Sequence, residues 1–275
     1  TPKPSSAASD VYKRQESRRR KMKYGFMAGC SLSSSSPKQV AQIIDYLKGF
    51  YPDLAVIQGC CGKPTRMIGQ EQLFQQRFGQ LSEQVHKAGI DELIVACQGC
   101  IKTMTLQNQF PTSSLWVKMA ELGLPKEAIG KGKTSDVVFS IQDSCPTKEM
   151  TEIHQAVRYL LEQLGYQVQK NRLSGKNTLC CGMGGMCGVS NPNLAKDFAA
   201  KRVQDFKTDH IVTYCSSCTS AMILGGGEAW HLLDLIFGEV IHKDDKSPAH
   251  PLDNPIRAWK NRYCLLYTSD AADEA

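Results

Sequence analysis

The sequence contains no apolar run that approaches the ~18–20 residues needed to cross a membrane, although 41% of its 275 residues are hydrophobic. The apolar stretch at 24–29 is also shorter than the ~7–15 residues at the core of a secretion leader. The basic cluster at 18–23 is short and has no interleaved aromatic residues, which argues against nucleic-acid binding. These absences predict a cytoplasmic protein, with any attachment to a membrane made through a partner.

The sequence has only six histidines but twelve cysteines, and one of these, Cys264, lies in the C-terminal tail. The other cysteines follow the order C…CCG…CxxC twice, and Cys187 alone has no counterpart in the first copy. Between the adjacent pair and the CxxC lie 35 residues in the first copy and 33 in the second. Between the lone cysteine and the pair lie 29 and 34. A repeat of this length indicates a duplicated domain.

Apolar runs and helical periodicities alternate in the same order in both copies. In the first half we expect strands at 23–30, 53–62 and 92–100, with helices at 36–51 and 71–89. In the second half we expect strands at 136–145, 176–182 and 210–218, with helices at 151–166 and 191–207. This alternation predicts an α/β fold of two pseudo-symmetric, Rossmann-like βαβ halves with parallel sheets.

The cysteines fall where these expected strands end. Ligands of parallel sheets gather beyond the carboxyl ends of the strands, so five thiols of each half should converge on one place. Buried cysteines without a ligand would instead be scattered along strands and helix faces.

The ends of the chain show no periodicity and resemble translations of a sequencing adaptor. We therefore divide the chain into an adaptor-like segment and linker at 1–21, a first half at 22–130 and a second half at 131–245. A C-terminal tail at 246–275 follows, of which 264–275 is adaptor-like. Met22 is the expected native start.

Five soft thiolates in one pocket favour an iron–sulfur site. Tetrahedral zinc needs four ligands, usually from two CxxC-like turns, and each half has only one CxxC. A cubane [4Fe–4S] cluster also needs only four thiolates, so the fifth must serve a larger ligand set or react beside the cluster. A zinc-stabilised binding module stays open as an alternative. The glycine-rich stretch at 182–188 lacks the spacing of a dinucleotide loop.

The doubled C…CCG…CxxC pattern resembles the CCG-domain iron–sulfur proteins, such as the CCG-containing subunit of heterodisulfide reductase. Related subunits occur in anaerobic glycerol-3-phosphate dehydrogenase, lactate-utilisation complexes and thiol:fumarate reductases. The resemblance covers about residues 22–240. It implies two [4Fe–4S]-type clusters, cubane or non-cubane. The cysteines that would bind these metal cofactors are Cys30, Cys60, Cys61, Cys97 and Cys100 in the first half and Cys145, Cys180, Cys181, Cys215 and Cys218 in the second.

The resemblance further implies an oxidoreductase subunit that transfers electrons to a disulfide substrate, or cleaves it, at these clusters. It identifies no catalytic side chain apart from them. An alternative is an electron conduit between a flavin dehydrogenase, of the lactate or glycerol-3-phosphate type, and quinone. The chain lacks the CxxCxxCxxxCP run of ferredoxins, so we expect a ferredoxin-like iron–sulfur partner subunit and, behind it, a flavoprotein subunit.

Overall fold

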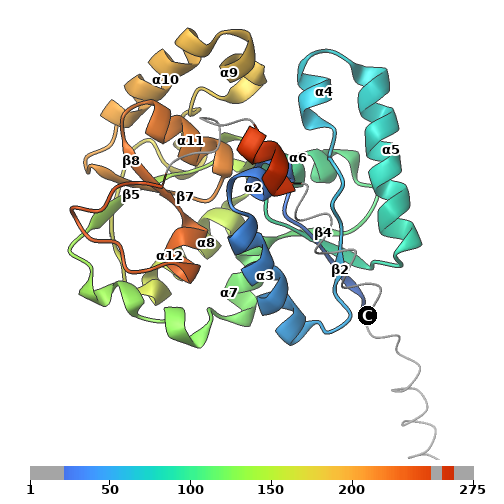
Figure 1. The fold of residues 1–275 in the computed structure, drawn as a ribbon, viewed down its shortest axis with the longest axis horizontal. Coiled ribbons are helices and arrows are strands. Elements are labelled where there is room, and N and C mark those ends of the chain that lie inside the picture. The colour runs from blue at the N-terminus through green and yellow to red at the C-terminus, as the bar shows by residue number, and fades with distance from the viewer. Residues whose placement is uncertain (1–21, 249–255, 263–275) are drawn as a thin grey trace, which may run out of the picture.

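The computed structural model describes residues 22–248 and 256–262, which form two parallel β-sheets surrounded by helices (Figure 1). Each sheet has four strands, in the order β2–β1–β3–β4 and β6–β5–β7–β8. The strands of the first sheet are β1 (Tyr24–Met27), β2 (Ala55–Val56), β3 (Glu92–Val95) and β4 (Thr112–Ser114). Those of the second are β5 (Val138–Gln142), β6 (Gln167–Gln169), β7 (His210–Thr213) and β8 (Glu228–His231). The predicted fold class is confirmed.

Helices connect the strands in the same order in both halves. Those of the first half are α2 (Cys30–Ser35), α3 (Pro37–Phe50), α4 (Lys63–Met67), α5 (Glu71–Lys87), α6 (Gln98–Gln107) and α7 (Leu115–Leu122). Those of the second are α8 (Thr151–Leu164), α9 (Cys187–Ser190), α10 (Pro192–Gln204), α11 (Ser216–Leu224) and α12 (Leu232–Phe237). Five short 3-10 turns lie between them: η1 (Lys126–Ala128), η2 (Lys131–Thr134), η3 (Cys145–Thr147), η4 (Gly175–Asn177) and η5 (Gly184–Met186).

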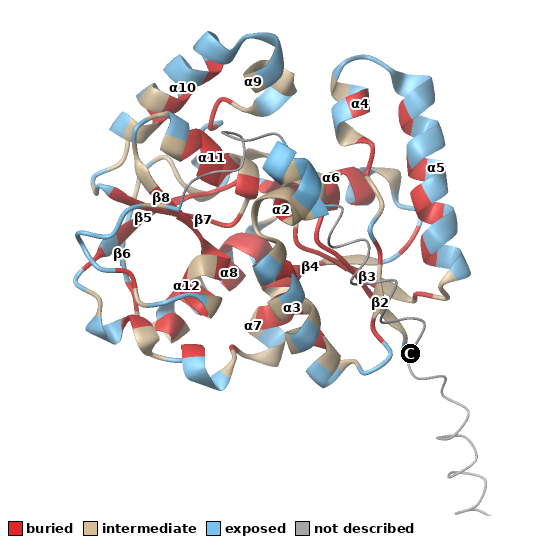
Figure 2. Ribbon diagram, viewed as in Figure 1, coloured by how far each residue is buried: buried red, intermediate tan, exposed pale blue. Residues whose placement is uncertain are grey.

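Helix α8 illustrates how the sequence pattern becomes packing. The helix ends at Gly165, whose φ of 84° suits glycine. Its apolar residues recur at helical spacing and are all buried: Ile153, Val157, Leu160, Leu161 and Leu164. The same helix packs against α7 of the first half. One cluster of buried apolar side chains includes residues of both halves, so the two sheets are held together by shared packing. Figure 2 shows the buried residues in the strands and helices of both halves.

The structure differs from the predictions at one segment of the second half and in the tail. The strand expected at 176–182 is wrong, because β6 lies at 167–169 and residues 175–177 form η4. Side chains make the hydrogen bonds there instead: Gln142 donates to the backbone carbonyl of Leu179, and the Thr178 hydroxyl donates to the carbonyl of Asp143. The tail contains an unexpected helix at 256–262. The adaptor-like segments at 1–21 and 264–275 lie outside the described residues.

Within the described ranges, no helix combines the length and the apolar character needed to cross a membrane.

Candidate functional site

The structure brings the five predicted cysteines of the first half together, and we call them the first thiol group. Cys30 begins α2, the adjacent pair lies between β2 and α4, and Cys97 immediately precedes α6. Cys100 donates a hydrogen bond to Cys61 with an Sγ–Sγ distance of 3.1 Å, and it also bonds to Cys97. Cys30 bonds to Cys60. These bonds form two sets, one of three thiols and one of two, and the adjacent positions of Cys60 and Cys61 in the chain bring the two sets together.

The second half repeats this arrangement, and its five cysteines form the second thiol group. Cys145 and Cys181 both bond to Cys180. Cys218 bonds to Cys181 and to Cys215. Cys180 is the exposed member, and its pair follows a loop rather than a strand.

The Cys187 thiol donates to the carbonyl of Asn191 at 3.7 Å, and among the described residues no hydrogen bond connects it to either group. Among residues 22–248 and 256–262, no three His, Cys, Asp or Glu side chains are arranged to hold a single metal ion. The sulfurs are instead hydrogen-bonded to one another. Which of the thiols bind a cofactor stays a prediction.

Short helices begin at both thiol groups and direct backbone N–H groups toward them. The amide of Gly182 donates to Cys180 Sγ at 3.4 Å, and that of Gly62 bonds in the same way to Cys60. Gly62 and Gly182 have φ values of 73° and 92°, which other residues rarely adopt. The glycine after each cysteine pair therefore turns the chain so that free amides face sulfur, an arrangement that favours anionic sulfur.

Hydrogen bonds within each group divide the thiols into donors, whose pKa is raised, and acceptors, whose pKa is lowered. The bond from Cys30 lowers the pKa of Cys60 to about 6, and that from Cys145 lowers the pKa of Cys180 to about 2. The bond to Cys180 raises the pKa of Cys181 to about 12. The bond from Cys218 lowers the pKa of Cys215 to about 6. The hydrogen bonds therefore favour the anionic form of one thiol in the first group, Cys60, and of two in the second, Cys180 and Cys215.

The sheet register shows that different residues lie beneath the two thiol groups, at the ends of the central strands. Phe26 and Met27 pair with Ile94 and Val95, so Ala28 and Ala96 come next. In the second half, the equivalent step brings Asp143 beside Tyr214. Both of these positions are buried, as are the two alanines.

Asp143 and Tyr214 form the centre of a polar network beneath the second thiol group. The Tyr214 hydroxyl donates to Asp143 Oδ1 at 3.0 Å and accepts from the Ser144 amide at 3.2 Å. Arg158 contacts both carboxylate oxygens, at 3.1 and 2.7 Å. Burial alone would raise the pKa of Asp143, but the hydrogen bonds and charge of Arg158 outweigh it and lower the pKa. Sequence reasoning missed this network, because only the register reveals the pairing.

The two thiol groups approach each other at two contacts between the halves. Ser31 Oγ, next to Cys30, lies 3.4 Å from Ser217 Oγ in the second CxxC. Thr147, in the turn that begins at Cys145, donates to Gln98 of the first CxxC at 3.3 Å. Helices α2 and α11 are in contact, and so are α6 and η3. Figure 1 shows α2, α6 and α11 gathered at the middle of the molecule. The groups thus lie on opposite sides of a narrow polar contact.

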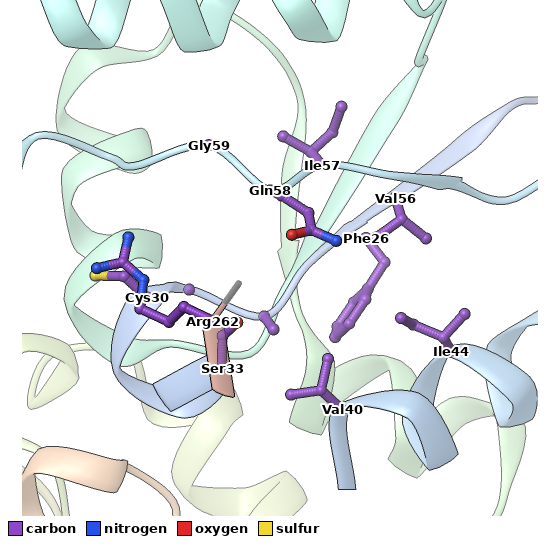
Figure 3. A pocket seen from close by; sticks show the side chains of 12 residues that line it. Phe26, Cys30, Ser33, Val40, Ile44, Val56, Ile57, Gln58, Gly59 and Arg262 are labelled. Atoms are coloured by element: carbon purple, nitrogen blue, oxygen red, sulfur yellow. The ribbon is translucent and has the colours of Figure 1, made fainter. Parts of the chain in front are cut away.

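A cavity of about 50 Å³ opens beside Cys30 in the first half. Figure 3 shows Cys30, Ser33 and Arg262 at one end and the apolar side chains of Val40 and Ile44 at the other. Arg262 comes from the unexpected tail helix, and Asn261 of that helix donates to the carbonyl of Ser34 at 2.8 Å. Arg262 and Arg77 both help to lower the pKa of Cys60. Chemically, the site offers thiolates, cations and a small apolar recess.

A family model described as a cysteine-rich domain, CCG, matches residues 24–105 and again residues 139–223. The "EtfAB:quinone oxidoreductase" of Syntrophomonas wolfei subsp. wolfei is 27% identical over 231 residues, covering 76% of this chain and 32% of that protein. An uncharacterized iron-sulfur protein of Methanocaldococcus jannaschii is 22% identical over 203 residues, covering 72% and 40%. One subunit of the fumarate reductase (CoM/CoB) of Methanothermobacter marburgensis is 24% identical over 205 residues, covering 70% and 40%. The chain spans a third to two fifths of the length of these relatives.

Proposed function

Because the chain belongs to the CCG family of cysteine-rich domains, which matches both of its halves, we propose that it is the iron–sulfur, electron-transferring part of an oxidoreductase. The observation that carries the proposal is the convergence of five thiols in each half. The names of its relatives support the same class, since they include an oxidoreductase, a reductase subunit and an iron–sulfur protein.

In this proposal the first thiol group holds one cluster of the [4Fe–4S] type, cubane or non-cubane, and the second thiol group holds another. The residues fit such a group, because soft thiolates, backbone amides and helix N-termini all face the same place. Bound clusters would supply one-electron storage and transfer.

The chain itself supplies the path and the setting for this transfer. The contacts Ser31–Ser217 and Gln98–Thr147 connect residues next to cysteines of opposite halves, so electrons would have a short route between the two groups. Lys63 contributes positive charge at the first group, where it lowers the pKa of Cys61. Its Nζ lies 3.1 Å from the point where a Cβ on Gly99 would stand.

We infer that the finer function is heterodisulfide-reductase-like. Two electrons delivered to the chain would break the S–S bond of a disulfide, and two protons would complete the two thiol products. The electrons would come from a ferredoxin-like iron–sulfur partner, supplied in turn by a flavoprotein. Either could be a separate subunit or a further segment of a longer polypeptide.

The second candidate is an electron conduit between a flavin dehydrogenase and quinone, with no bond cleavage at this chain. The relative named an EtfAB:quinone oxidoreductase favours it.

Anaerobic purification with iron, sulfide and zinc analysis tests the cofactor. About eight irons with matching sulfide per chain supports two four-iron clusters, whereas about two zincs without sulfide would instead support a zinc-stabilised module. The reduced protein is then mixed with a model disulfide. Stoichiometric thiol release supports the reductase, and reoxidation by a quinone analogue without thiol release supports the conduit.

A further inference from the structure

The residue that follows each CCG motif differs between the two halves. In the first half Lys63 follows Gly62 and begins α4, whereas in the second half Met183 follows Gly182. The two cysteines and the glycine before this position are the same in both copies. The duplicated framework therefore carries a cation at the first thiol group and an uncharged side chain at the equivalent place of the second.

The Lys63 ammonium lies against the first CxxC. A Cβ placed on Gly99, between the two cysteines of that motif, would lie 3.1 Å from Lys63 Nζ and 3.7 Å from Cys97 Sγ. Lys63 is half-buried, and α4 and α6 are in contact. Within the described residues, no carboxylate forms an ion pair with Lys63. Its charge at the first thiol group is therefore not offset by an ion pair.

Two arginines add positive charge to the same group. Arg262 lines the cavity beside Cys30, and Figure 3 shows its guanidinium next to that cysteine. Arg77 donates to the Thr65 hydroxyl in α4, the helix that follows the cysteine pair. In the part of the chain that the structure describes, neither arginine is paired with a carboxylate. The first thiol group thus has three unpaired cations around it.

The arginines near the second thiol group are paired instead. Arg158 contacts Asp143 beneath the group at 2.7 Å, and Arg202 contacts Asp205 at 3.2 Å. Arg202 reaches the segment before Cys180 through Gln142, whose side chain accepts from Arg202 and donates to the Leu179 carbonyl. In each pair a carboxylate offsets the guanidinium charge.

This difference in charge affects how easily each site accepts an electron. The reduction potential of an iron–sulfur site depends on the net charge around it, on hydrogen bonds to sulfur and on solvent exposure. Reduction adds negative charge, so an unpaired cation favours the reduced form. Backbone amides bond to sulfur in both groups and do not distinguish them. The exposure of Cys180 favours the second site but concerns one sulfur, whereas three unpaired cations act on the first.

We propose that Lys63, Arg77 and Arg262 make the first thiol group the site of higher reduction potential, so that electrons enter at the second group and collect at the first. This inference rests on the proposed function, since it requires a cluster at each group. Each transfer moves one electron: the second site is oxidised as the first is reduced, and the iron–sulfur partner then reduces the second again. The exposed Cys180 suits the entry side, and the cavity beside Cys30 lies at the receiving side.

The test is a potentiometric titration of the full anaerobic protein, followed by electron paramagnetic resonance. We expect two reduction steps with separate midpoints. Lys63→Met should lower only the higher midpoint, with about a tenfold smaller equilibrium constant for reduction, or ~59 mV for one electron. Met183→Lys places the cation at the equivalent position of the second group and should raise only the lower midpoint. Lys63→Arg keeps the charge and should keep both midpoints.

The matched control is Lys126→Met, which removes an exposed lysine from η1, a turn without cysteines. It should leave both midpoints unchanged. A single midpoint for both sites would overturn the inference, and so would a Lys63→Met shift in the lower midpoint or one no larger than that of Lys126→Met. Iron analysis of the same samples separates the two proposals. Any of these results with about eight irons per chain refutes this inference alone, whereas a protein without iron refutes the proposed function as well.

Discussion

Replacing Arg158 by methionine tests whether the network under the second thiol group stabilises the fold. The Asp143 side chain is fully buried, whereas that of Arg158 is 38% exposed. Removing one partner of a buried ion pair costs ~3–5 kcal/mol, because the other charge is left uncompensated. Asp143 would keep the Tyr214 hydroxyl and the Gly175 amide as donors. With these donors and the partial exposure of Arg158, we expect about 3 kcal/mol, the lower end of that range.

Anaerobic urea unfolding at neutral pH, followed by circular dichroism, measures this loss. Asp143→Asn should cost less, roughly 1–2 kcal/mol, because the amide keeps an acceptor and leaves no buried charge. Arg172→Met is the control, an exposed cation of the neighbouring loop whose removal should change stability by less than about 0.5 kcal/mol. The folded pKa of Asp143 is lowered, so its stabilisation is present above the unfolded value of ~3.9 and is lost as the pH falls further. A loss in Arg158→Met no larger than that in Arg172→Met would refute the reasoning.

Two further substitutions test the packing around the thiol groups. Gly29 has a φ of 83°, and a Cβ there would lie 2.5 Å from Cys97 Cβ, so Gly29→Ala should both destabilise the protein and disturb the first thiol group. Gly69→Ala has a similar φ of 81° with open space, and in unfolding experiments it should show only the ~1–2 kcal/mol cost of that conformation. Burial lowers the pKa of His231 to about 3. In the unfolded chain this histidine binds a proton near pH 6.5, so the free energy of unfolding should fall by ~1.4 kcal/mol for each unit by which the pH drops from 6.5 toward 3. His231→Asn, which keeps an N-cap acceptor, should remove that contribution to the slope of unfolding free energy against pH, and an unchanged slope would show that His231 is not the group responsible.

The strand–helix alternation was sufficient to predict the fold class, because buried parallel strands read as short apolar runs between amphipathic helices. It was also sufficient to predict which thiols meet, since cysteines beyond the ends of neighbouring parallel strands share one edge of the sheet, although the pair Cys180–Cys181 follows a loop instead of a strand. The strand expected at 176–182 failed for a specific reason. Side-chain hydrogen bonds from Gln142 and Thr178 replace the ladder there, and such tertiary bonds leave no periodic signal.

Other features of the fold could not be predicted from the sequence. β4 has only three residues, and β8 follows a glycine-rich turn, so neither presents a clear alternation. Asp143 and Tyr214 are distant in sequence, and each precedes a cysteine without forming a motif. Their contact follows from the pairing of β5 with β7. The tail helix at 256–262 and its Arg262 beside Cys30 likewise depend on chain packing.

The central claim is that each thiol group binds its own cluster, and iron counting in half-site variants tests it most directly. The variants are Cys60→Ser with Cys61→Ser for the first group and Cys180→Ser with Cys181→Ser for the second, with Cys187→Ser as the control. Purified anaerobically, each double variant should keep about four of the roughly eight irons expected for two four-iron clusters, with the paramagnetic signal of the untouched half intact. Cys187→Ser should keep the full content. Full iron content in either double variant, or loss of all iron from both, would contradict two independent sites.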